Sequence, residues 1–94
     1  MINQIVLVGR LDKLFNTENK KDIYLQVERP FKENNEIKVD VFKCRAWISI
    51  FDKVLSLCKL GDLLAIKGRC VYEDGEFLVM AENIVILNKY TNTI

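Results

Sequence analysis

The sequence has no histidine, a single proline and only four glycines. Without histidine, the chain lacks the commonest general base and every nucleophile activated by a Ser-His or Cys-His pair. The four glycines lie far apart, so they do not form a phosphate-binding loop. These absences argue against an enzyme of a usual type.

Cysteines and long hydrophobic runs are also scarce. Cys44, Cys58 and Cys70 are odd in number and include no C-x-x-C pair, so we expect buried reduced thiols rather than disulfides or a zinc site. No apolar run approaches the roughly 18 residues that a membrane span requires. The N-terminus lacks the basic start of a signal peptide. We therefore expect a cytoplasmic protein with no cofactor, no metal and no membrane partner.

No strong charge of either sign is present. Lysine and arginine total 14 and the acidic residues 13, which leaves a net charge of +1. A nucleic-acid partner would therefore require cations that are gathered locally. The composition, half hydrophobic and 29% charged, is ordinary for a globular protein. We expect one domain over residues 1–94, since a chain of this length has no room for a second.

Runs of β-branched and alternating apolar residues predict strands along most of the chain. We expect these strands at residues 2–11, 23–29, 37–48, 63–72 and 76–87. The polar residues 12–22 should form a loop, and Pro30 should end the second strand because proline cannot donate to a ladder. Asn34-Asn35 is typical of a turn. Asp74-Gly75 predicts a type I′ hairpin between the last two strands.

The period becomes helical after the third strand. Phe51, Val54, Leu55 and Cys58 follow the spacing i, i+3, i+4, i+7 of an amphipathic helix. Three strands, one short helix and two strands form the layout of an OB-fold, a five-stranded Greek-key barrel. We therefore expect an all-β OB-fold whose barrel ends near residue 88, followed by a short frayed C-terminus.

The third expected strand has an unusual outer face. Its inner face carries Phe42, Cys44, Ala46 and Ile48. Its outer face carries Val41, Lys43, Arg45 and Trp47. Single-stranded nucleic acid needs cations near its phosphates and flat rings for its bases, each stacked base being worth about 1–3 kcal/mol. Since OB-folds bind on an outer sheet face, Lys43, Arg45 and Trp47 are candidate binding residues.

The segment ERPFK repeats this combination at the end of the second strand. Arg29 and Lys32 supply cations, and Phe31 supplies a ring in a loop that suits a core poorly. Two alternatives stay open. Trp47 and Phe31 could pack over an end of the barrel, and the cations could form an ordinary solvated face.

The last hairpin offers one further cation. Its register places Tyr72 opposite Phe77 on the core face, which favours a stabilising cross-strand contact and makes Tyr72 a weaker binding candidate. Arg69 lies on the other face and is the better candidate. Leu78 and Met80 are also expected outside the barrel, as an apolar patch under the bases or in a subunit interface.

Five segments, MINQIVLVGRL, RPFK, CRAW, GDLLAIKGR and AENIVIL, occur in the order and spacing of bacterial-type single-stranded DNA-binding proteins. The chain resembles this family over roughly residues 1–88. The resemblance implies an OB-fold that coats single-stranded DNA without strong sequence preference, in replication, recombination or repair, as a homodimer or homotetramer without catalytic activity. It implies DNA contacts from the matching positions, which are Arg10, Phe31, Lys43, Arg45, Trp47 and Arg69.

The chain departs from the family pattern in four ways, two of which are a shorter loop between the first two strands and a last hairpin that is cut to a tight turn. Val41 occupies a position where the family commonly has a second aromatic on the third strand. The chain also ends without the family's acidic tip, which recruits replication and repair enzymes, so replication proteins remain only a candidate partner. A replication-assembly module like primosomal replication protein N, acting mainly through protein interactions, is the alternative. An RNA-binding barrel is a third, since stacking and phosphate contacts serve both nucleic acids.

Overall fold

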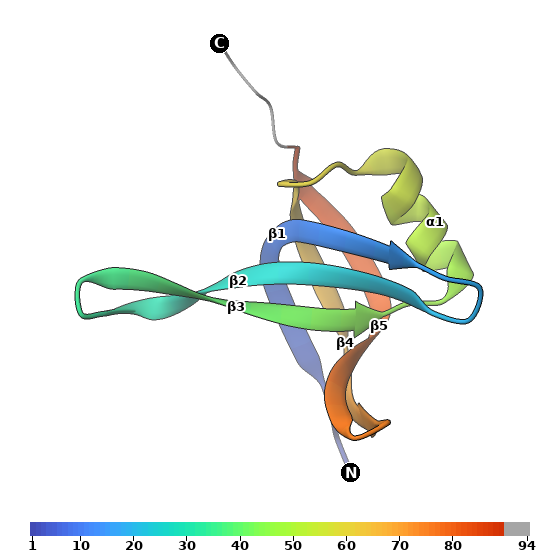
Figure 1. The fold of residues 1–94 in the computed structure, drawn as a ribbon, viewed down its shortest axis with the longest axis horizontal. Coiled ribbons are helices and arrows are strands. Elements are labelled where there is room, and N and C mark those ends of the chain that lie inside the picture. Colours follow the sequence, from blue (N-terminus) through green and yellow to red (C-terminus); the bar gives the residue numbers. More distant parts are fainter. Residues whose placement is uncertain (90–94) are drawn as a thin grey trace.

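In the computed structural model, which describes residues 1–89, five strands close into a barrel in the order β1-β2-β3-β5-β4 (Figure 1). The elements are β1 (Ile5–Asn16), β2 (Lys21–Glu33), β3 (Glu36–Arg45), α1 (Ile48–Leu57), β4 (Leu63–Glu73) and β5 (Glu76–Asn88). All pairings are antiparallel except that of β3 with β5, which is parallel. This topology confirms the predicted OB-fold. The expected frayed C-terminus lies outside the described residues.

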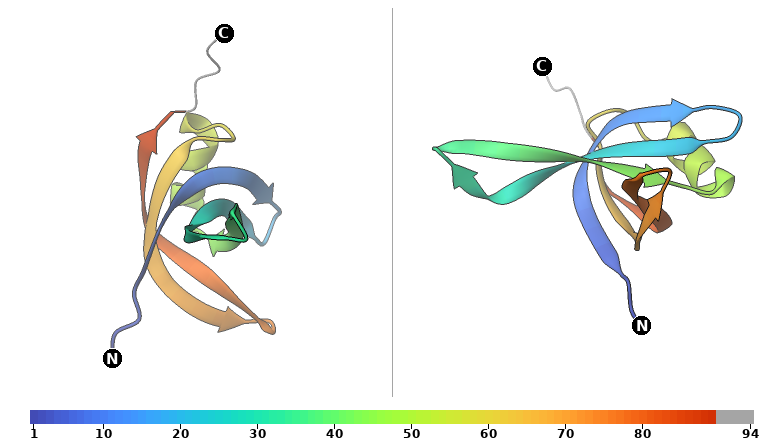
Figure 2. Two further views of the ribbon diagram at one scale, coloured as in Figure 1. Left: turned by 90° about the vertical axis from the view of Figure 1, so that its left-hand side faces the viewer. Right: turned by 60° about the horizontal axis from the view of Figure 1, so that its bottom comes forward.

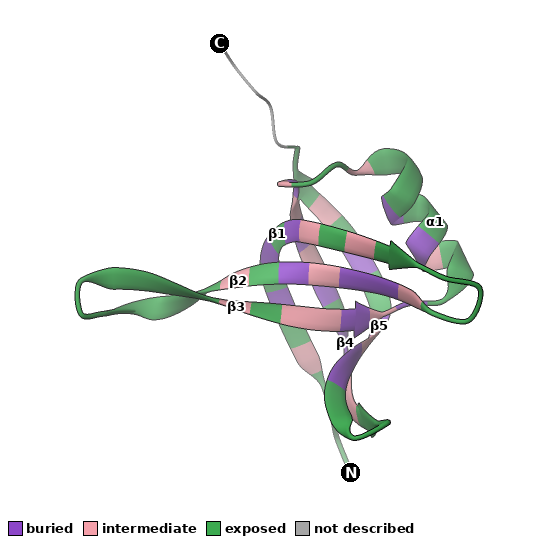
Figure 3. Ribbon diagram, viewed as in Figure 1, coloured by how far each residue is buried: buried purple, intermediate pink, exposed green. Residues whose placement is uncertain are grey.

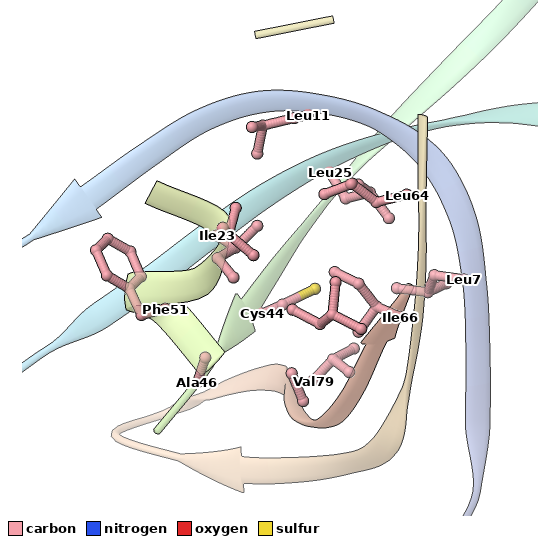
Figure 4. Close-up of a cluster of buried hydrophobic side chains, with 13 residues drawn as sticks. Leu7, Leu11, Ile23, Leu25, Cys44, Ala46, Phe51, Leu64, Ile66 and Val79 are labelled. Atoms are coloured by element: carbon pink, nitrogen blue, oxygen red, sulfur yellow. The ribbon is translucent and has the colours of Figure 1, made fainter. Parts of the chain in front are cut away.

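Inward-facing residues from all five strands and the helix form one core (Figures 3 and 4). The buried members are Leu7, Leu11, Ile23, Leu25, Cys44, Ala46, Phe51, Val54, Leu64, Ile66, Val79, Ala81 and Ile84. The helix joins this core through Phe51 and Val54, whereas Leu55 is half exposed. Within residues 1–89, α1 is far too short to cross a lipid bilayer, and the chain offers no other helix.

The cysteines are free thiols, and Cys44 is fully buried. Desolvation, helped by the negative charge of Asp22, raises the pKa of Cys44 to about 12. Its thiol therefore stays protonated at neutral pH and acts as a small apolar group. Cys58 and Cys70 are only half-buried, so the expectation of buried thiols is confirmed for one of the three.

The first strand and the loop after it were predicted wrongly. β1 continues to Asn16, and its pairing with β2 ends at Asn16↔Lys21, so only a few residues form the connection. The register shifts between Leu11 and Lys13, which marks a bulge. A bulge inserts one extra residue and breaks the period of two. Leu14 therefore packs against the core despite its apparently polar setting.

The second strand passes through Pro30, contrary to prediction. The register of β2 against β3 shifts between Glu28 and Lys32, so Pro30 lies where no regular ladder bond is required. Beyond this point the two strands form a two-stranded arm, residues 29–38, that projects from the barrel (Figures 1 and 2). Asn34 and Asn35 turn the arm with φ of 53° and 64°, which confirms the predicted turn.

The third strand is shorter than predicted, because it ends at Arg45 and Trp47 already serves as the N-cap residue of α1. Its inner face is confirmed at Cys44 and Ala46, which are buried, and Phe42 packs against them. Ile48 is 63% exposed, since the chain has turned into the helix before it could continue the inward alternation.

The last hairpin has the predicted register. Tyr72 pairs with Phe77, and Asp74-Gly75 turns with positive φ at both residues. Two expectations about its faces are wrong. Tyr72 and Phe77 are mostly exposed, since the hairpin extends beyond the barrel (Figure 1). Leu78 is buried rather than outward, because the hairpin curls towards β3 and Leu78 shares a groove with Phe42.

Candidate nucleic-acid interface

Three strands place cations on both sides of one aromatic ring. Register pairs Lys13 of β1 with Tyr24 of β2, and Tyr24 with Lys43 of β3. The Lys13 ammonium lies 4.7 Å from the centroid of the Tyr24 ring, within cation–π range. Gln26 and Val41 form the next pair on the same side. We call this solvent-facing side of β1, β2 and β3 the outer face.

Trp47 stands where the outer face meets the helix. The side chain is 70% exposed, so the alternative of a core tryptophan is wrong. It borders a cavity of about 190 Å³ that Asn19, Lys21 and Met80 also line. A large indole beside a lysine and the β1–β2 connection suits an unpaired base better than a packed interior.

Phe31 stands at the other end of β2, on the arm. It is 79% exposed, and the arm projects away from the barrel rather than folding over its end (Figure 2). The alternative of a loop anchor is therefore wrong. Arg29 holds the arm together, because its guanidinium donates to Asp40 at 2.9 and 3.0 Å and to Glu33 at 2.7 Å. The hydrogen bond from Arg29 lowers the pKa of Asp40, desolvation opposes this shift, and the positive charge of Arg29 adds to it.

Arg45 is on the outer face but is less accessible than expected. Only 16% of its side chain is exposed, its Nε donates to buried Asp22 at 3.1 Å, and its Nη1 donates to Glu73 at 2.9 Å. Burial lowers the pKa of Arg45, yet these hydrogen bonds and charges raise it overall. The first role of Arg45 is therefore to neutralise the charge of the buried Asp22 carboxylate. A DNA phosphate that bound Arg45 would have to displace Glu73.

Lys43 is similarly occupied. Its ammonium lies 3.0 Å from a Glu76 carboxylate oxygen, and 23% of the side chain is exposed. The hydrogen bond that Lys43 donates to Glu76 raises the pKa of Lys43, so the ammonium stays charged at neutral pH. Beside this pair runs a groove of about 590 Å³ between β3 and the β4–β5 hairpin. The hairpin thus frames the outer face with carboxylates as well as aromatic rings.

The remaining candidate binding residues lie on the arm, on β1 and on the β4–β5 hairpin. Lys32 is exposed on the arm, and Arg10 is exposed on β1 with its Nη1 donating to the Gly61 carbonyl at 3.2 Å. Arg69 of β4 lies beyond Met80, which separates it from Arg45, and faces Glu82 at 3.6 Å. Tyr72 braces Phe77 edge-on, with ring centroids 4.8 Å apart.

Sequence reasoning missed three members of this surface. Tyr24 could have been found, because the inward alternation of Ile23, Leu25 and Val27 places it outside. Lys13 was hidden by the bulge in β1, which shifts its register. Phe77 was assigned to the core, since nothing in the sequence shows how far the hairpin extends beyond the barrel.

Searches for similar proteins agree on one group. No protein-family model matches the chain. Single-stranded DNA-binding protein 1 of Streptococcus pyogenes is 34% identical, over 99% of this chain and 84% of its own length. Single-stranded DNA-binding protein B of Bacillus subtilis is 32% identical, over 73% and 67%. The chain belongs to the family of single-stranded DNA-binding proteins.

Solved structures of this family show the same fold at low identity. The mitochondrial single-stranded DNA-binding protein Rim1 of Saccharomyces cerevisiae superposes with a TM-score of 0.76 at 11% identity, covering 95% of this chain and 97% of Rim1. A small single-stranded DNA-binding protein of Streptomyces coelicolor gives 0.68 at 17% identity, covering 92% and 95%. These structures support the OB-fold, and the two relatives at 34% and 32% identity favour the family over the replication-assembly module.

Proposed function

We propose that this chain binds single-stranded DNA without strong sequence preference, by base stacking and phosphate contacts, in DNA replication, recombination or repair. The observation that carries the proposal is the exposure of Phe31 and Trp47, at 79% and 70%, near the two ends of the surface built by β2 and β3. A large aromatic ring interacts weakly with water, whereas it can stack favourably on one unpaired base. The proposal includes no catalytic step.

The decisive experiment is a titration of a 30–40-nucleotide dT strand with mass measurement, which gives affinity, stoichiometry and assembly together. Tight binding supports the proposal. An affinity of tens of micromolar or weaker would favour a protein-interaction module instead. Competition between DNA and RNA strands of matched sequence decides between the two nucleic acids, because stacking and phosphate contacts alone do not.

Binding should weaken as the salt concentration rises. Each phosphate neutralised on a single strand contributes a log–log slope of about −0.7. Lys32→Ala should remove close to one such unit, because Lys32 is exposed on the arm beside Phe31. Lys43→Ala should remove less, since its charge is already balanced by Glu76. Titrations at several salt concentrations measure these slopes, and an unchanged slope for Lys32→Ala would remove the arm from the binding path.

We also propose that the chain is a homodimer or homotetramer. Leu78 cannot supply the apolar surface predicted for an interface, because it is buried. The outward side of β1, β4 and β5 can supply it instead. Val8, Ala65 and Val85 are register partners across these strands, and Val6 and Leu87 extend the patch. The four aliphatic side chains other than Ala65 are 48–61% exposed, and a patch of this kind marks an interaction site.

Light scattering at micromolar concentration should give two or four times the chain mass of 11.0 kDa. Val8→Lys should shift the mass towards the monomer, because it places a charge in the middle of the apolar patch. Val39→Lys is the matched control, since Val39 is similarly exposed, at 46%, but lies on β3. A parent chain that scatters only as an 11.0 kDa monomer would refute the oligomer.

A further inference from the structure

The groove between β3 and the β4–β5 hairpin has two apolar walls. Tyr24 and Val41 line it from the outer face, and Phe77 and Leu78 line it from β5. Its volume of about 590 Å³ falls within the roughly 300–1,000 Å³ of pockets that hold small organic ligands. The groove is therefore large enough for one nucleotide, and its walls carry the aromatic and aliphatic side chains against which a flat base can pack.

The hairpin wall is held in place rather than free. Phe77 is 72% exposed, yet Tyr72 braces it edge-on at 4.8 Å. Two ion pairs tie the same hairpin to β3, Lys43–Glu76 at 3.0 Å and Arg45–Glu73 at 2.9 Å. Because β5 otherwise pairs with β3 only at two positions, these contacts set the distance between the two walls.

The groove also carries hydrogen-bonding groups. The Lys43 ammonium has three protons, of which the Glu76 pair uses one, and the Glu76 carboxylate keeps free lone pairs. Every unpaired base presents both donors and acceptors along its edge. A base between the two walls could therefore meet a donor and an acceptor without breaking the ion pair.

We propose that this groove is a base-binding pocket, in which one base of the bound strand packs between Tyr24 and Phe77. The proposal rests on the proposed single-stranded DNA binding and adds a third stacking site to Phe31 and Trp47. The groove is continuous with the outer face through Val41 and Lys43, so a strand crossing that face passes its mouth. Phe77 thereby supplies, from the opposite wall, a ring that β3 lacks at Val41.

Photo-cross-linking tests occupancy directly. A dT strand carrying 5-iododeoxyuridine is irradiated in complex with the parent protein, and tandem mass spectrometry locates the adducts. We expect adducts on Tyr24 or Phe77 in addition to those on Phe31 or Trp47. Adducts confined to Phe31 and Trp47 would overturn the pocket while leaving the proposed function intact. A parent protein that does not bind the strand at all would refute the proposed function itself.

Two substitutions at one position test the energetics. Phe77→Leu should weaken binding of the dT strand by about 5- to 150-fold, the equivalent of one stacked base. Phe77→Trp should keep the affinity, because it keeps a flat ring on the same wall. Both variants should melt close to the parent, since the side chain is largely exposed. Equal affinity of the leucine variant and the parent would overturn the pocket.

Discussion

Trp47→Ala should weaken binding of a dT strand by roughly 1–3 kcal/mol, the usual worth of one stacked base. The reason is the position of the indole, which is 70% exposed at the junction of β3 and α1 and borders a cavity that Lys21 also lines. A strand that runs along the outer face towards the β1–β2 connection would meet this ring. Trp47→Phe is the matched control, because it keeps a flat ring and should retain most of the affinity.

The same variant should change stability little. Deletion of a buried tryptophan typically costs about 3–5 kcal/mol, but the exposed ring of Trp47 leaves no cavity of that kind when it is removed. The fluorescence of the parent protein gives an independent reading, because Trp47 is the single tryptophan of the chain. Addition of dT should quench it strongly if a base stacks on the indole.

Phe31→Ala should behave in the same way. Phe31 is carried by the arm and Trp47 by the start of α1, so the two rings would hold different bases. The losses of the two single variants should therefore be nearly additive in the double variant. Unchanged affinity in both single variants, with no quenching in the parent, would mean that the DNA follows another surface.

The strand pattern and the tight turns could be predicted from the sequence because each depends on local chemistry. Asp74-Gly75 and Asn34-Asn35 tolerate positive φ, and both turns form where these residues stand. The extent of β1 and β2 could not be predicted. The bulge near Asp12 and the register shift around Pro30 are determined by how each strand pairs with its neighbours. A short stretch of sequence does not contain the information about this pairing.

For the candidate site, alternation in β3 correctly separated Lys43 and Arg45 from the core. It could not show that carboxylates from the distant β4–β5 hairpin occupy both cations, because these contacts span 28 and 33 residues of sequence. Nor could it show that Asp22 is buried against Arg45. These ion pairs form only when the barrel closes and brings distant strands together. The alternation of residues within one strand does not encode that closure.

Gly68→Ala should destabilise the closed barrel strongly. A Cβ at Gly68 would lie 2.0 Å from the carbonyl oxygen of Met80, and a backbone atom cannot move aside as a flexible side chain can. Gly68 also stands at a register shift between β4 and β5, where the two strands approach closely. Gly9 meets the same obstacle on β1, where a Cβ would lie 2.1 Å from the carbonyl oxygen of Gln26.

We expect Gly68→Ala to lower the free energy of unfolding by about 3 kcal/mol or more, at or beyond the upper end of overpacking costs. For a domain of this size, that corresponds to a fall in melting temperature of about 10–25 °C. Gly75→Asn is the control, because Gly75 has open space around its Cβ position and asparagine tolerates the φ of 79°. Thermal unfolding followed by circular dichroism compares the two variants. If Gly68→Ala melts with the parent, then β4 and β5 do not approach each other as closely as the barrel requires.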